Sequence, residues 1–142
     1  MTIQYMSDLH LEFTENRLFM QRLHPKVTGD ILLIAGDSFY LGDDDIIKSE
    51  FLKWAADNYE QVLMIPGNHE YYGGCDIKQM GTEWEWKLMS NVCYYYNKVV
   101  TIGDTDFILS TLWSHITPQH KKSVGYFLTD FHRIKYHGRK FT

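Results

Sequence analysis

The chain has 142 residues, of which 44% are hydrophobic and 23% are charged, and its formal net charge is −4. This length suits one domain with a real hydrophobic core, and the composition excludes a disordered tail, a coiled coil and a collagen-like repeat. No apolar run approaches the roughly 20 residues of a membrane-spanning helix, so we expect no membrane partner.

Short apolar runs bounded by turn residues indicate buried strands. We expect such strands at residues 3–6, 30–35, 62–65 and 92–96. Residues 99–102 and 107–112 flank a polar Gly-Asp-Thr-Asp turn and are typical of the two arms of a hairpin. After Ser114 the pattern fades, and no clear final element is predicted before the end of the chain.

Apolar residues at helical spacing connect these strands. We expect a helix within residues 15–26, which Pro25 ends, and two further helices over 43–55 and over 77–88. Strands that alternate with helices predict a parallel sheet with helices on its faces, and the closing hairpin makes the sheet mixed. The expected fold class is therefore α/β, with a layered mixed sheet and flanking helices in a single domain over residues 1–142.

Each of the three predicted parallel strands is followed by a cluster of polar residues. Asp8 and His10 follow the first strand, Asp37 follows the second, and the third leads into Gly-Asn-His-Glu at residues 67–70. Ligands of open α/β sheets bind outside the carboxyl ends of the strands, and adjacent parallel strands bring those ends together. We therefore expect the three loops to meet in one site.

The residue types suit a site that holds two metal ions. In an extended segment Asp8 and His10 project the same way, so that a carboxylate and an imidazole can hold one ion. Asp37 has two oxygens and can bridge two ions, which two-metal hydrolases hold about 3.5–4 Å apart. Asn68 offers a neutral carbonyl oxygen to the second ion.

Ordinary turn chemistry also explains each cluster when it is taken singly. Asp-x-His after a strand is common in capped turns, and both Gly-Asp at 36–37 and Gly-Asn at 67–68 are usual turn sequences. The three clusters nevertheless occur in order, each at the end of an apolar strand, and turns do not require that coincidence. We therefore favour one metal site over three separate turns.

These segments also resemble a known family. SDLH at 7–10, AGDS at 35–38 and PGNHE at 66–70 resemble the first three motifs of the calcineurin-like metallophosphoesterases, and STLWS at 110–114 resembles the strand that many bacterial members carry next. The resemblance covers nearly the whole chain. It implies a metal-dependent hydrolase of phosphomonoesters, phosphodiesters or nucleotides, with a four-layer α/β/β/α fold of which this chain would supply the N-terminal half.

The resemblance further implies a role for each matching residue. The metal ligands would be Asp8, His10, Asp37 and Asn68. Asp37 would bridge two divalent ions. Manganese, iron, zinc or nickel ions suit these ligand types. His69 would be the catalytic residue, which protonates the leaving oxygen or stabilises the transition state without binding metal. Glu70 would orient a neighbouring histidine.

The sequence departs from the family in its second half. Members continue with a further histidine after another strand and then a Gly-His-x-His motif, which complete both metal sites, and neither is present here. His115 is the best substitute ligand, whereas His120, His132 and His137 lie in no such motif. We therefore expect a domain that is incomplete at its C-terminus, an incomplete second metal site, and little activity of this truncated form alone.

Two other interpretations stay open. The same fold serves some relatives as a catalytically silent scaffold that binds a protein partner, although scaffolds tend to lose the ligands that are intact here. Alternatively, two chains complete one another, because half of a layered domain would expose a sheet edge that favours self-association.

Charge and cysteine content bear on partners and location. Residues 115–142 carry 6 basic side chains and the single acid Asp130. This stretch is compatible with contacts to phosphate groups or nucleic acid, but a solvated segment that balances the acidic remainder explains it as well, and the overall acidity does not indicate a nucleic-acid-binding protein. Cys75 and Cys93 lack the spacing of a disulfide framework, which predicts a reducing, cytoplasmic location.

Overall fold

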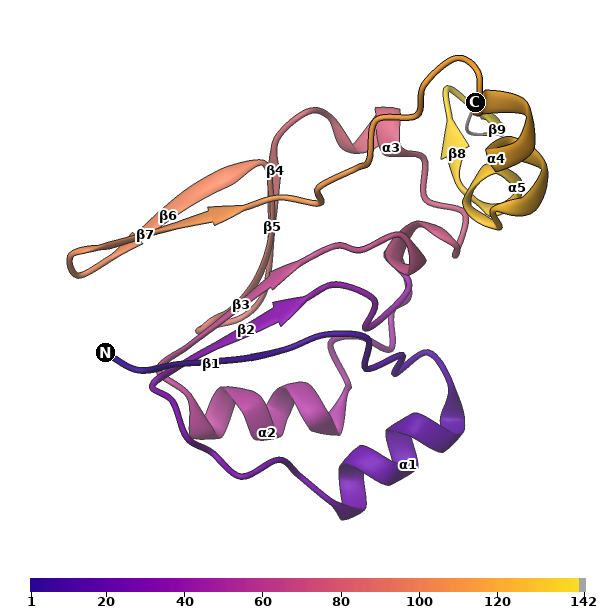
Figure 1. The fold of residues 1–142 in the computed structure, drawn as a ribbon. Coiled ribbons are helices and arrows are strands. Elements are labelled where there is room, and N and C mark those ends of the chain that lie inside the picture. The colour runs from indigo at the N-terminus through magenta and orange to yellow at the C-terminus, as the bar shows by residue number, and fades with distance from the viewer. Residues whose placement is uncertain (141–142) are drawn as a thin grey trace.

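The computed structural model describes residues 1–140 and contains a five-stranded central sheet (Figure 1). Its strands are β1 (Ile3–Met6), β2 (Ile31–Ala35), β3 (Gln61–Ile65), β4 (Trp84–Met89) and β5 (Val92–Tyr96). Their order across the sheet is β1-β2-β3-β5-β4, in which the first four run parallel and β4 pairs antiparallel with β5. The predicted α/β class with a mixed central sheet is confirmed.

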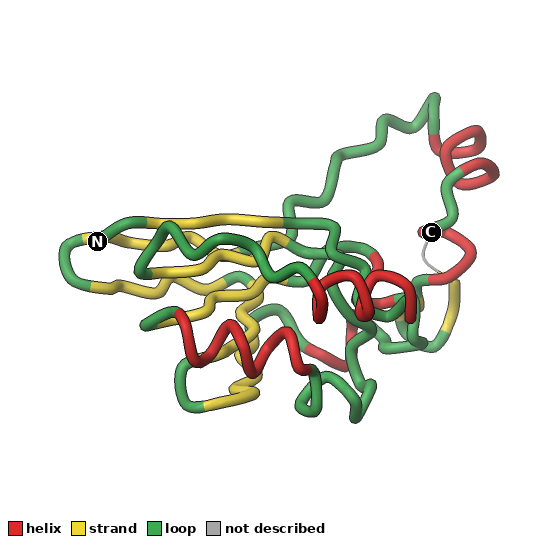
Figure 2. Tube along the Cα trace, turned by 90° about the horizontal axis from the view of Figure 1, so that it is seen from below, coloured by secondary structure: helices red, strands yellow, loops and turns green. Residues whose placement is uncertain are grey.

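Two helices cover one face of this sheet. Helices α1 (Thr14–Arg22) and α2 (Glu50–Asn58) lie on the same side of it (Figure 1, Figure 2). Because side chains alternate along a strand, Leu32 and Ile34 of β2 point to this face, where they share the main hydrophobic core with Leu52 of α2. Burying each such side chain contributes about 1.5–3 kcal/mol to folding.

The hairpin covers the opposite face. Strands β6 (Lys98–Ile102) and β7 (Thr105–Leu109) form a two-stranded sheet of their own. Phe107 of β7 belongs to one buried cluster with Ile31 and Leu63 of the central sheet. The expectation that this hairpin would join the central sheet and make it mixed was therefore wrong, since the antiparallel member is β4. The layers are therefore, in order, the helices α1 and α2, the central sheet, and the hairpin of β6 and β7.

The helix predicted over 77–88 was wrong for most of its length. Helix α3 (Ile77–Met80) is short, and Gly81 follows it with a φ of 86°, a left-handed conformation that favours glycine. In β4, Trp84 and Trp86 alternate with charged residues and stack on tyrosines of β5. This alternation has the period of a strand, and the cross-strand aromatic pairs stabilise it.

Helix α2 begins later than predicted. Residues 43–45, which were expected to open it, form turns instead. The helix starts after Ser49, whose hydroxyl oxygen accepts a hydrogen bond from the Leu52 amide at 3.4 Å. Serine is a preferred N-cap because it satisfies an amide that has no partner within the helix.

The segment after Ser114 is structured, although its sequence pattern did not predict this. It contains α4 (Lys121–Phe127), α5 (Asp130–Arg133), β8 (Lys135–Tyr136) and β9 (Arg139–Lys140). Residues 141 and 142 lie outside the described part of the chain. Figure 1 and Figure 2 place this segment at the end of the molecule opposite the N-terminus. Among the helices of residues 1–140, none is long and apolar enough to cross a membrane.

Candidate metal centre

Backbone hydrogen bonds join the loops that follow β1 and β2. The amides of Asp8 and His10 donate to the carbonyl oxygens of Gly36 and Asp37 at 3.1 and 2.9 Å. These bonds continue the pairing of the two parallel strands beyond their ends. The structure thus brings the first two predicted loops together, as their place at the carboxyl ends of the strands indicated.

Three of the predicted metal ligands have left-handed backbone conformations. The φ angle is 56° at Asp8, 47° at His10 and 56° at Asp37, and among residues 1–140 the other non-glycine residues with a positive φ are Asn97 and His137. Such conformations are uncommon outside glycine and concentrate at functional sites. They also correct the expected extended Asp-x-His segment, because residues with positive φ do not continue a strand.

The side chains of Asp8, His10 and Asp37 converge on one place. Each offers a ligand atom, and these atoms lie within 4.8 Å of one another. Two carboxylates and an imidazole form the mixed oxygen and nitrogen donor set that suits manganese, iron or zinc. The residues present therefore fit a divalent cation.

The Asp37 carboxylate also contacts the loop that carries the other predicted residues. Its Oδ1 atom accepts a hydrogen bond at 2.9 Å from the amide of His69, the first residue of the short 3₁₀ helix η1 (His69–Tyr71). A Cβ atom on Gly67 would overlap the same oxygen, so glycine is required there to make room for it. Asp37 thus lies between the loops, where a bridging ligand would be needed.

Glu70 is fully buried and links the loops that follow β2 and β3. Its carboxylate accepts hydrogen bonds from the amides of Asp37, Ser38 and Gly67 at 2.8–2.9 Å and from the Tyr94 hydroxyl at 3.1 Å. Burial raises the pKa of Glu70, and the backbone donors oppose that shift in part. These partners are amides and a tyrosine, whereas the sequence led us to expect a histidine.

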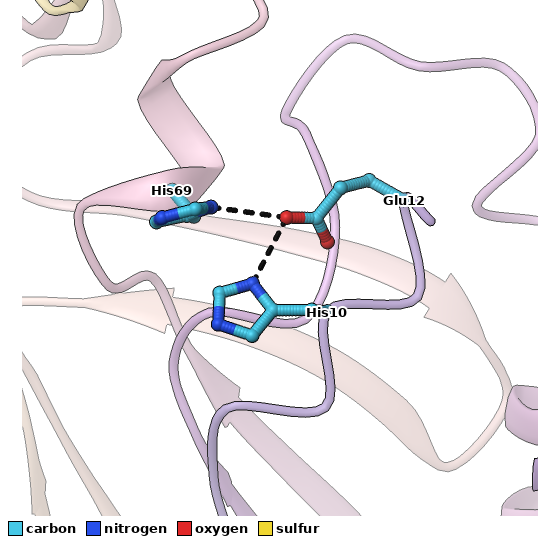
Figure 3. Close-up of side chains that lie close together, drawn as sticks. All are labelled: His10, Glu12 and His69. Atoms are coloured by element: carbon cyan, nitrogen blue, oxygen red, sulfur yellow. Dashed lines mark hydrogen bonds and ion pairs between the residues drawn. The ribbon is translucent and has the colours of Figure 1, made fainter. Parts of the chain in front are cut away.

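Glu12 is a site residue that the sequence analysis missed. Its side chain is only 2% exposed, and its Oε1 atom lies 3.0 Å from the Nδ1 atoms of both His10 and His69 (Figure 3). Its other oxygen, Oε2, is buried and has no hydrogen-bond partner within the described residues. A signal was present in the sequence, because Asp8, His10 and Glu12 alternate with leucines.

Asn68, the predicted ligand of the second ion, contacts the C-terminal segment. Its Nδ2 atom donates to Oδ1 of Asp130 at 2.7 Å and to the hydroxyl oxygen of Tyr72 at 3.0 Å, and the Tyr72 hydroxyl donates to Asp130. Burial and then the Asp130 carboxylate raise the pKa of Tyr72 to about 12, so this hydroxyl keeps its proton at neutral pH. The one available signal for Asp130 was its place as the single acid in a basic stretch.

The remaining histidines lie apart from these residues. His24 stacks on a tryptophan of α2, His120 bonds a neighbouring threonine, and His132 bonds a backbone carbonyl. Over residues 1–140, two groups of three His, Cys, Asp or Glu side chains are close enough to hold an ion: Asp8, His10 and Asp37, and His10, Glu12 and His69. His115, the predicted substitute ligand, is exposed and joins neither group.

A family comparison agrees with this arrangement. The family model of the calcineurin-like phosphoesterases matches residues 1–141. The chain belongs to the calcineurin-like phosphoesterase family. The resemblance inferred from the three motifs is confirmed.

Two known proteins are similar to this calcineurin-like phosphoesterase chain. An uncharacterized protein of Acanthamoeba polyphaga mimivirus is 30% identical in an alignment 157 positions long, gaps included, which covers 94% of this chain and 51% of that protein. The crystal structure of phosphopantetheinyl hydrolase from Mycobacterium tuberculosis matches with a TM-score of 0.57 and 18% identity, over 94% of this chain and 54% of that one. At this identity the likeness shows the fold alone. The chain spans about half the length of both proteins.

Proposed function

We propose that the protein is a metal-dependent phosphoesterase that hydrolyses a phosphomonoester, a phosphodiester or a nucleotide. The observation that carries this proposal is the convergence of Asp8, His10 and Asp37, all in left-handed conformations, in a chain of this family. These three residues would hold one divalent ion, and Asp37 and Asn68 would hold the other. When bound, such ions neutralise phosphate oxygens and lower the pKa of a water molecule that attacks phosphorus.

The protein's own side chains orient the reacting groups. Glu12 accepts hydrogen bonds from the Nδ1 atoms of His10 and His69, which leaves the Nε2 atom of each ring free. In our proposal His10 uses that atom as a ligand, and His69, in its imidazolium form with protons on both ring nitrogens, uses it to donate a proton to the leaving oxygen. Glu70 holds the loops of Asp37 and Gly67 in place before substrate binds.

We also propose that the 142-residue chain hydrolyses phosphate esters slowly on its own. Asp37 and Asn68 are the residues here that match the family's ligands for the second ion, and the family's later histidines have no counterpart in the sequence. An ion with two protein ligands is held weakly. Slow turnover and weak binding at the second position follow.

Metal binding and hydrolysis test both parts of the proposal. We expect calorimetric titration with Mn²⁺ to show binding that Asp37→Ala abolishes and that Asp57→Ala, at an exposed position of α2, leaves unchanged. Hydrolysis of bis(p-nitrophenyl) phosphate should be slow, dependent on Mn²⁺ and lost in the same variant. A wild-type chain that binds no metal would refute the phosphoesterase and favour a silent scaffold. Rapid hydrolysis that requires Asp37 would refute the proposed low activity.

The setting of this activity is also a proposal. Cys75 and Cys93 are free thiols, which supports a reducing compartment such as the cytoplasm. The edge strand β1 carries exposed apolar side chains, which supports self-association. The substrate would be a phosphate ester, and no feature of the described residues favours nucleic acid over other such esters.

A further inference from the structure

Asp130 reaches the metal centre from a part of the chain far away in sequence. It opens α5, and Ile134, directly after that helix, is fully buried with Leu41 and Tyr71. Further along, the buried Asp76 carboxylate accepts hydrogen bonds from the amides of the β8–β9 turn. The C-terminal segment is therefore held firmly enough against the body of the protein to place a side chain accurately.

The Asn68 amide group has an acceptor for each of its two N–H protons. One proton is donated to Asp130 and the other to the Tyr72 hydroxyl oxygen. The Tyr72 hydroxyl in turn donates to the same oxygen of Asp130, so the three side chains form a closed ring of hydrogen bonds. With both protons engaged, the carbonyl oxygen Oδ1 of Asn68 is the atom left over for another partner.

The carboxylate of Asp130 determines the orientation of the Asn68 side-chain amide. An ionised carboxylate accepts hydrogen bonds and donates none, so it pairs with the NH₂ group of Asn68 and repels the carbonyl oxygen. Rotating the amide by half a turn would set two oxygens against each other. Arg133, three residues after Asp130, lies over the Tyr72 ring at 5.4 Å from its centroid and supports the third member of the ring.

We propose that Asp130 is a positioning residue that orients the Asn68 amide so that its carbonyl oxygen, and not its NH₂ group, is offered to the second metal ion. This inference rests on the proposed function for the identity of the ligand, but the orientation itself needs no metal. It makes the C-terminal segment a part of the metal centre, although that segment supplies no ligand of its own.

The orientation is tested by NMR on the full chain without metal. The Asn68 side-chain NH₂ signals can be assigned by their loss in Asn68→Asp. We expect their protons to exchange with water at least about tenfold faster in Asp130→Ala than in wild type, because a charge-assisted hydrogen bond is lost. Asp130→Asn retains an acceptor and should restore part of the protection, whereas Asp57→Ala should change nothing. Unaltered exchange in Asp130→Ala, with the remaining spectrum intact, would overturn the inference.

Metal titration tests the consequence. Loss of a side chain that orients a ligand typically weakens metal binding by about 10–100-fold. We expect a weakening of this size for the second Mn²⁺ ion in Asp130→Ala, with the first ion bound as in wild type. If Asp130→Ala bound both ions with the same affinity as wild type, the positioning role would be refuted. If wild type bound no Mn²⁺ at all, the proposed function would fail, and the NMR comparison would still decide whether Asp130 orients the amide.

Discussion

A single buried carboxylate, that of Glu70, connects two loops of the site at the point where the sheet stops. The pairing of β2 with β3 ends at Ala35 and Ile65, and the amides just beyond have no strand partner. Glu70 accepts hydrogen bonds from amides in both loops and from the Tyr94 hydroxyl. Glu70, together with the hydrogen bond from the His69 amide to Asp37, thus sets the spacing of the loops that carry Asp37 and Asn68.

Replacing that side chain should destabilise the whole domain. We expect Glu70→Ala to lower the free energy of unfolding by about 3 kcal/mol, because several buried donors lose their acceptor at once. Urea denaturation followed by circular dichroism measures this change. Glu60→Ala, at an exposed position before β3, provides the matched control and should stay close to wild type. A loss no larger than in the control would contradict the linking role.

The sequence predicted where the site lies but not all of the side-chain contacts within it. Apolar strands followed by Asp8, Asp37 and Asn68 could be recognised because a strand and the residue after it are local features. The contacts of Glu12 with His69 and of Asp130 with Asn68 could not, because they join residues that lie 57 and 62 positions apart along the chain. Periodicity carries no information about contacts over such distances.

Among the elements, the C-terminal hairpin of β8 and β9 is attached to the body of the protein through the carboxylate of Asp76. This residue precedes α3, and its carboxylate accepts hydrogen bonds from the amides of Lys78, His137 and Gly138. The Gly138 amide contributes most to lowering the pKa of Asp76 below its ordinary value. The ionised form is therefore favoured in the folded protein, and its stabilising effect exists only while the group is ionised.

The attachment should consequently weaken in acid. Because the native pKa is lowered, the contribution of Asp76 is present above its ordinary pKa of 3.8 and is lost as the pH falls through the native value. We expect Asp76→Asn to melt at a lower temperature than wild type at pH 7, and this difference to shrink between about pH 4 and pH 2. Thermal melts at a series of pH values test this, with Asp57→Asn as the control. A difference independent of pH would contradict it.

The sequence predicted long elements better than short ones. The apolar runs of β2 and β3 stand out because both faces of these strands are buried. By contrast, α5 has 4 residues and β8 and β9 have 2 each, and Asp76 and the buried Ile134 hold this segment in place. Such elements depend on tertiary contacts, which override local propensity and leave little trace in the pattern.

On the scale of the whole molecule, the outer strands of the central sheet and of the hairpin carry exposed apolar side chains. Tyr5 on the edge strand β1 is 80% exposed, and Ile108, on the side of β7 that faces away from the core, is 82% exposed. Unpaired edge strands and exposed apolar surface favour association between chains. The proposed self-association would use the free edge of β1.

A charged residue on the edge strand should oppose that association. We expect light scattering to show a mass that increases with concentration for wild type, and Tyr5→Lys to shift the protein towards the monomer, because a lysine at a sheet edge disfavours strand pairing. Tyr126→Lys on α4 changes a similarly exposed tyrosine at the other end of the molecule and should leave the mass unchanged. A monomer at all concentrations in wild type would refute the association.

The left-handed backbone at Asp8, His10 and Asp37 also limits which residues evolution or design can place there. A suitable residue must both supply a metal ligand and tolerate a positive φ angle. Asn, Asp and His are the side chains that adopt this conformation several-fold more often than others, and they are also ligands. Glutamate and cysteine bind metals but lack this backbone preference. The set of residue types that can occupy these three positions is therefore smaller than the set that can bind a metal ion.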